Sequence, residues 1–158
     1  MYRKFSFEGN VHQTLECVPL TVRRKLDLAE LKISLRGWQA LSMAERMALC
    51  HLPVDSEEEV QVYRDVLAGF AARGATPLEP LGDPGVGLRP WNVGEPPALV
   101  RDRLAQMSIA LSTDTWAALD EESRYALLKM ANPKRAPEKL RAVAVELGIA
   151  GPVSEKET

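Results

Sequence analysis

An internal repeat constrains the fold of this chain more than any other feature of its sequence. Residues 22–52 align without a gap on residues 100–130 when the sequence is shifted by 78 positions, and ten of the 31 aligned residues are identical. The fold must therefore provide two equivalent places for one kind of segment. The identical pairs are Val22/Val100, Arg23/Arg101, Leu26/Leu104, Ser34/Ser112, Trp38/Trp116, Ala40/Ala118, Leu41/Leu119, Arg46/Arg124, Ala48/Ala126 and Leu49/Leu127.

Each copy opens with apolar residues at helical spacing. Steps of four, three and four residues separate Val22, Leu26, Ala29 and Ile33, and the same steps separate Val100, Leu104, Met107 and Leu111. One apolar stripe at this period is typical of an amphipathic helix. The pattern predicts a helix in each copy, with Pro19 in the first turn or Thr21 as the cap of the first one.

A short helical turn around each tryptophan and a second helix follow. Ser42 and Glu45 have the spacing of a capping box, and Asp120 in the second copy suits the positive end of a helix dipole. Pro53 and Pro133 are expected to end these helices.

A third helix is predicted in each half. The first has a cap with an acidic first turn in 55–59 and a left-handed stop at Gly74, and the second begins at Pro137 and stops at Gly148. Their predicted apolar stripes are Val60, Tyr63, Leu67 and Phe70, and Leu140, Val143, Ala144 and Leu147.

These elements predict an all-α fold. A three-helix unit of about 50 residues buries too little surface to be comfortably stable alone, so we expect the two repeats to pack as a pseudo-twofold pair in one compact domain. The expected organisation is a single domain over 1–150, with an extended segment to 18, repeat one at 19–74, a Pro/Gly-rich connection at 75–97, repeat two at 98–150, and a disordered tail at 151–158. The side chains of Phe5 and Phe7 in the extended segment are expected to pack on the helical body.

The connection is too rich in Pro and Gly for a regular helix or a central strand. Its apolar residues, Leu81, Val86, Leu88 and especially Trp91, predict that it is held against the protein rather than free. The Gly-rich run 82–87 is read as a turn, because neither a strand nor a Gly-Lys-Ser/Thr motif accompanies it.

The charge balance argues against nucleic acid as a partner. The net charge is −2, which leaves no excess of Lys and Arg to neutralise phosphates. The basic run 23–25 is interpreted as a solvated helix face paired with acidic residues. No apolar run approaches the roughly 20 residues of a membrane span, so a cytoplasmic protein with no membrane contact is expected.

The repeated Trp and Arg residues are interpreted as structural anchors. Trp38 and Trp116 suit the core of each repeat, although they could also line a ligand cavity. Arg46 and Arg124 lie eight residues after them and are expected to bond carbonyl groups at the end of the tryptophan turn or to stack on the indole. An anion or partner contact is the functional alternative for these arginines.

The sequence offers little for catalysis or metal binding. Its two cysteines, Cys17 and Cys50, and its two histidines, His12 and His51, have no metal-ligand spacing. Cys50 fits a small buried apolar residue on a stripe with methionines. A thiol enzyme built on either cysteine is therefore the least favoured hypothesis, and no cofactor is expected.

The order of several motifs resembles the nitrate reductase-associated protein family. The resemblance runs through Phe5–Glu8, Leu15–Pro19, Val22–Asp27, Leu31–Trp38, Glu45–Arg46, Leu52–Pro53, Tyr63–Arg64, Trp116 and Arg124. It implies a non-catalytic accessory protein that helps a molybdenum cofactor enzyme, such as assimilatory nitrate reductase, to mature or stay active through protein contact.

Residues outside the repeat are the expected place for such a contact. The candidates are Cys17, Trp91 and Arg23, in the N-terminal segment, the connection and the start of the first helix. The alternative function is a helical small-molecule or cofactor-binding module with its site between the two repeats.

Overall fold

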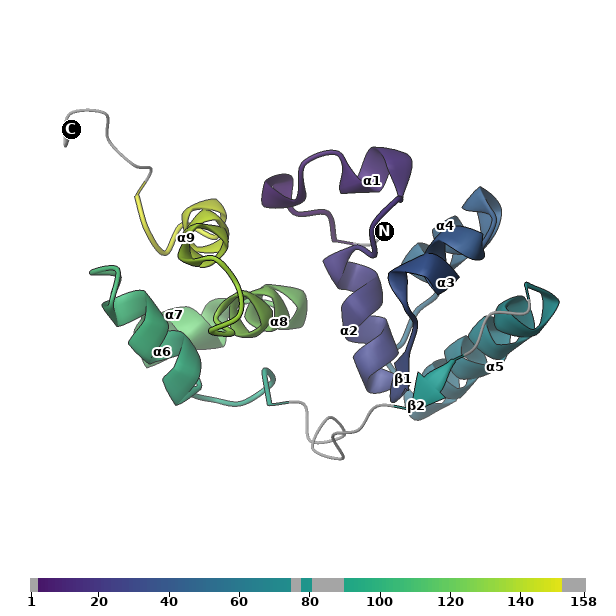
Figure 1. Cartoon of the computed structure of the whole chain (residues 1–158). Helices are drawn as coiled ribbons and strands as arrows, with labels where there is room; N and C mark the ends of the chain where they lie inside the picture. Colours follow the sequence, from purple (N-terminus) through teal and green to yellow (C-terminus); the bar gives the residue numbers. More distant parts are fainter. Residues whose placement is uncertain (1–2, 75–77, 81–89, 152–158) are drawn as a thin grey trace. The chain divides into compact units, whose positions relative to one another are not determined.

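The computed structural model describes residues 3–74, 78–80 and 90–151, and these are mostly helical (Figure 1). The coarse prediction of a helical fold is therefore confirmed. In chain order the described elements are a 3-10 helix Ser6–Glu8, α1 (Val11–Thr14), α2 (Leu20–Leu28), β1 (Leu31–Lys32), α3 (Leu35–Ala40), α4 (Met43–His51), α5 (Glu57–Arg73), β2 (Glu79–Pro80), α6 (Ala98–Ala105), α7 (Thr113–Ala118), α8 (Glu121–Met130) and α9 (Pro137–Glu146).

The chain divides into two compact units. Unit 1 comprises Met1–Lys4 and Glu8–Arg89, and unit 2 comprises Phe5–Phe7 and Pro90–Thr158. The boundary falls inside the connection between the two copies of the sequence repeat. The predictions of one domain and of a pseudo-twofold relation stay predictions.

The core of unit 1 forms around α2. This helix packs against β1, α4 and α5, and the two short strands pair antiparallel with Leu31 opposite Pro80 and Lys32 opposite Glu79 (Figure 1). Most side chains of the predicted apolar stripes lie in this core. The buried cluster consists of Leu15, Val22, Leu26, Ala29, Trp38, Leu41, Leu49, Cys50, Val54, Tyr63 and Leu67.

In unit 2, α8 packs against α9 and α6. Phe5, from the N-terminal segment, is buried as predicted, with its ring centroid 5.5 Å from that of Phe7. The buried apolar residues from 90 onward are Trp91, Val100, Leu104, Ile109, Leu111, Trp116, Tyr125, Ala126, Leu127, Met130, Ala131, Leu140, Val143 and Ala144.

The helix starts follow the predicted capping chemistry. Ser42 and Glu45 form both bonds of a capping box, and the Asp120 side chain accepts from the backbone N–H of Ser123. Pro137 is the first residue of α9. The predicted cap in 55–59 is Ser56, whose hydroxyl accepts from the N–H of Glu59.

The first helix of each copy is shorter than its apolar stripe predicted. Helix α2 ends at Leu28 and α6 at Ala105, so Ile33 and Leu111 lie outside them. The physical reason is a left-handed residue after each helix, Glu30 with φ 57° and Ser108 with φ 60°, which no α-helix can contain.

Two further local predictions are corrected. The N-terminal segment is not extended, since it forms the 3-10 helix and α1, and Gly9 makes the turn between them with φ 65°. Gly148 is left-handed as predicted, with φ 75°, but Gly74 ends α5 with φ −87°.

Several sequence predictions fall outside the described residues. These are the apolar contacts of Leu81, Val86 and Leu88, the turn at 82–87, and nearly all of the tail, from residue 152 onward. Among the helices that the structure does describe, none has the length and apolar character needed to cross a membrane.

Tyr63 provides a test of the unit 1 core. It is 0% exposed, and its hydroxyl donates to the Leu49 carbonyl at 2.8 Å. Burial, with a smaller contribution from Cys50, raises the pKa of this hydroxyl well above its ordinary value of 10.0, although Arg24 partly opposes the shift.

The raised pKa predicts a loss of stability at alkaline pH. Above pH 10 the unfolded chain releases the Tyr63 proton and the folded chain keeps it, so the free energy of unfolding falls by about 1.4 kcal/mol per pH unit from this group. Its contribution is fully present below pH 10. Urea denaturation between about pH 8 and about pH 11.5 should show a steeper decline for the wild type than for Tyr63→Phe, and equal slopes would contradict the assignment.

Candidate functional site

The chain before α2 is held by the tryptophan of α3. The Trp38 indole N–H donates to the Leu15 carbonyl at 2.7 Å, and Arg46 Nη1 donates to the same oxygen at 3.2 Å. Leu15 is buried and left-handed, with φ 51°. Two donors on one carbonyl therefore fix the point at which the N-terminal segment turns toward α2.

Two of the next three residues, Glu16 and Val18, are also held through their backbone. Gln39 Nε2 donates to the Glu16 carbonyl and Arg23 Nε to the Val18 carbonyl, each at 3.1 Å. Between them Cys17 is exposed. We call Leu15–Val18 the held segment. It presents the thiol of Cys17 and the side chain of Glu16 from a backbone in a defined position.

Unit 2 contains the same arrangement 78 residues later. The Trp116 indole donates to the Val93 carbonyl at 2.7 Å, and Arg124 Nη1 donates to the Asn92 side chain at 2.9 Å. Val93 is the residue 78 positions after Leu15. The two copies therefore have equivalent hydrogen bonds that begin before the 31 repeated residues, at Leu15 and Val93.

Both arginines also make the carbonyl contacts predicted for them. Arg46 donates to Trp38 O at 3.2 Å and Gln39 O at 2.7 Å. Arg124 donates to Trp116 O at 3.1 Å and Ala117 O at 2.9 Å, with its guanidinium carbon 5.8 Å from the Trp116 ring centroid. Both indoles are 0% exposed, and the interpretation of these four residues as structural anchors stays a prediction.

Trp91 is buried, so its indole is not presented to a partner. Its N–H donates to Glu121 Oε1 at 3.1 Å, and its ring meets the Tyr125 ring edge-on, with centroids 4.9 Å apart. Trp91 is 2% exposed. This burial agrees with the prediction that the connection is held down at this residue.

The basic run 23–25 is not the solvated face that its sequence suggested. Lys25 is buried, and its ammonium group donates to the carbonyls of Cys50, at 2.6 Å, and Leu52. These carbonyls lie at the negative end of α4, where a cation is stabilised. Arg24 is buried too, and Arg23 is half-buried on the held segment.

The cysteines do not form a shared site. Cys17 is exposed and Cys50 is buried, and Cys50 lies in the unit 1 core as predicted. The methionines that were placed on its stripe, Met43 and Met47, are instead exposed. Within the ranges that the structure describes, no group of three or more His, Cys, Asp or Glu residues could hold a metal ion.

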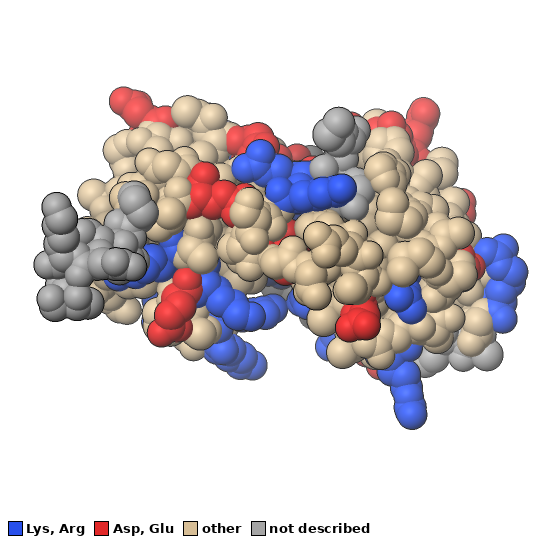
Figure 2. All heavy atoms as spheres, turned by 90° about the horizontal axis from the view of Figure 1, so that it is seen from above, with Lys and Arg blue, Asp and Glu red and all other residues tan. Residues whose placement is uncertain are grey.

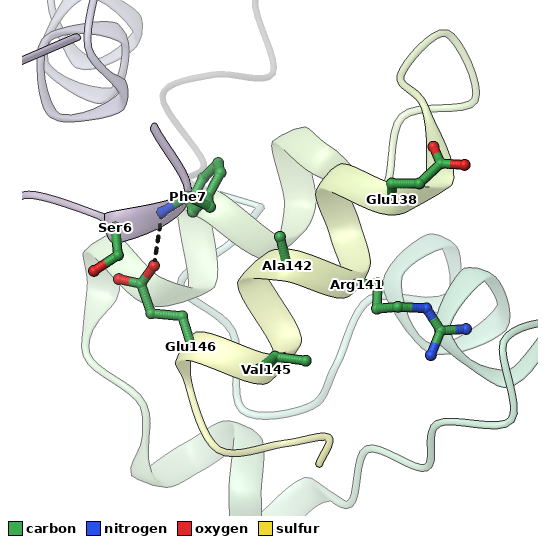
Figure 3. A pocket seen from close by; sticks show the side chains of 7 residues that line it. All are labelled: Ser6, Phe7, Glu138, Arg141, Ala142, Val145 and Glu146. Carbon is green, nitrogen blue, oxygen red and sulfur yellow. Dashed lines mark hydrogen bonds between the residues drawn. The ribbon is translucent and has the colours of Figure 1, made fainter. Parts of the chain in front are cut away.

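An open groove of about 740 Å³ follows α9 in unit 2. Figure 3 shows Phe7 beside this helix, with its backbone N–H donating to Glu146 Oε1 at 3.0 Å. The sequence predicted that this phenylalanine packs on the helical body but gave no sign of a groove. Its lining is Ser6, Phe7, Glu138, Arg141, Ala142, Val145 and Glu146.

Charged side chains of both signs are mixed on the face drawn in Figure 2, with uncharged surface between them.

The held segment predicts unequal effects of one substitution in the two units. Trp38→Phe removes one of the two donors to the carbonyl of buried Leu15 and leaves Arg46, whereas Trp116→Phe removes a donor from the carbonyl of Val93, a residue that is 41% exposed. We expect Trp38→Phe to lower the free energy of unfolding by about 0.5–1.5 kcal/mol, the net contribution of one hydrogen bond, and Trp116→Phe by less because water can replace its lost bond. Urea denaturation of both variants measures this; the volume change is the same, and an equal loss would contradict the difference.

The sequence comparisons identify one family. The model of the family described as conserved nitrate reductase-associated protein matches residues 4–146, which include the held segment and both copies of the repeat. This match confirms the resemblance seen in the motifs. The chain matches no curated protein and no solved structure.

Proposed function

Because the chain belongs to the conserved nitrate reductase-associated protein family, we propose that it is a non-catalytic accessory protein. It supports the maturation or activity of a molybdenum cofactor enzyme, such as assimilatory nitrate reductase, by binding that enzyme directly. The family match over residues 4–146 is the observation that carries this proposal. The family's description is that of an associated protein rather than of a catalyst.

The held segment is the proposed contact with the client enzyme. Its carbonyl groups are bonded to Trp38, Arg46, Gln39 and Arg23, so its backbone loses little conformational freedom when a partner binds. Its exposed side chains, Glu16 and Cys17, remain available for contact. Of the three contact residues predicted from sequence, Cys17 keeps this role, Arg23 supports it through the backbone, and Trp91 is replaced because it is buried.

The proposal predicts a physical complex and a loss of client activity. A tagged chain expressed in its own host is expected to co-purify with an apo-molybdoenzyme, and a deletion strain is expected to have lower nitrate reductase activity. Restoring the gene should restore the activity. Normal activity in the deletion strain together with no co-purifying molybdoenzyme would contradict the proposed function.

Cys17 allows the contact itself to be tested. It is exposed while Cys50 is 0% exposed, so a thiol-reactive photocrosslinker should label Cys17 alone in the folded protein. We expect the labelled chain to crosslink to the client on illumination. The control is Cys17→Ser with Glu95→Cys, because Glu95 is exposed and lies 78 residues after Cys17. Equal crosslinking from both positions, or none from Cys17, would place the contact elsewhere.

A further inference from the structure

An uncharged face of α4 is open in unit 1. Met43, Ala44, Met47 and His51 are all exposed, and their spacing places them on one side of the helix. Met43 is 49% exposed and Met47 is 37% exposed. We call these four residues the α4 face. Exposed methionines contribute little to the core, so folding alone does not account for them.

The corresponding face of α8 is covered. Shifting the α4 face by 78 positions gives Glu121, Glu122, Tyr125 and Lys129. Tyr125, the counterpart of Met47, is only 1% exposed; its ring meets the Trp91 ring edge-on, and the Lys129 ammonium lies 5.4 Å from the Tyr125 ring centroid. An aromatic side chain from outside the helices therefore covers this face in unit 2.

Trp91, which covers α8, has an equivalent position in unit 1. Trp91 lies two residues before Val93, whose carbonyl is held by the Trp116 indole. In unit 1 the held carbonyl is that of Leu15, and the residue two positions before it is Gln13, which is exposed. The position that places an indole on α8 in unit 2 is therefore occupied in unit 1 by a residue that is not aromatic.

We infer that the α4 face is a docking site for an aromatic side chain of the client enzyme, which covers it as Trp91 covers α8. This inference rests on the proposed function, since the client supplies the aromatic group. The ring is expected to be a phenyl group: Glu121 accepts the Trp91 indole proton in unit 2, whereas its counterpart Met43 is a weak acceptor. Methionine sulfur also makes favourable contacts with aromatic rings.

Helix α4 is bonded to the held segment. Arg46, a residue of α4, donates to the Leu15 carbonyl, and Gln39 of α3 donates to that of Glu16. The helix that carries the α4 face is therefore attached directly to the segment proposed to meet the client.

The test uses purified apo-nitrate reductase of the same host as the probe. Met47→Lys and Met43→Lys are each expected to weaken its binding at least about tenfold, since a charge would be buried under the docked ring. Leu99→Lys, at a 40% exposed residue of α6, is the matched control and should bind as the wild type does. Thermal denaturation of each variant establishes that it is folded.

A second measurement reports on the ring itself. With ¹³C-methyl-labelled methionine, the Met43 and Met47 methyl signals should move upfield in the complex because of the aromatic ring current, while that of buried Met130 should not.

Unchanged signals, or wild-type binding by both lysine variants, would overturn the inference and leave the proposed function standing. If the wild-type chain does not bind apo-nitrate reductase and no other molybdoenzyme co-purifies, the proposed function fails and this inference fails with it.

Discussion

Each unit depends on a buried indole whose N–H must find an acceptor. Trp38 and Trp116 are completely buried, and in both units the acceptor is a carbonyl 23 residues earlier in the chain. A buried indole without that bond would cost about 1–3 kcal/mol. The bond therefore fixes where the chain runs before the first helix, and Pro19 and Pro97 then begin α2 and α6 only four residues later.

The repeated arginines bond the same parts of the chain as the indoles do, which explains why they accompany the tryptophans. Each guanidinium bonds two carbonyls in the last turn of the short tryptophan helix, where few backbone acceptors have a partner within the helix. Its remaining nitrogen reaches the upstream segment, at Leu15 in unit 1 and at Asn92 in unit 2. Three parts of the chain that are distant in sequence are thus joined by one side chain.

Local interactions were predictable from sequence, and interactions between distant residues were not. The capping box at Ser42 and the start of α9 at Pro137 depend on neighbours within one helical turn, so their patterns are visible in the sequence. Lys25 looked solvated because its acceptors lie 25 and 27 residues away. The stripe that continued to Ile33 was misread as helix because a side chain beyond the left-handed Glu30 can still pack on the core. The sequence named Cys17 as a possible partner contact, but it gave no sign of the four donors that hold its segment.

The residues that differ between the two copies are available for function, because the hydrogen bonds of the repeated tryptophans and arginines do not depend on them. The tryptophans and arginines of the two copies make equivalent bonds except at Nη1, which reaches the Leu15 carbonyl from Arg46 and the Asn92 side chain from Arg124. In contrast, the outer side of α4 carries exposed methionines and that of α8 carries a covered tyrosine. Replacing the residues of the α4 face by polar ones would leave every hydrogen bond of Trp38 and Arg46 in place. Apolar side chains that are exposed together on one helix face suit a surface that a partner covers. In unit 2 the cover is Trp91, and in the described part of unit 1 the corresponding residue is Gln13, which is exposed.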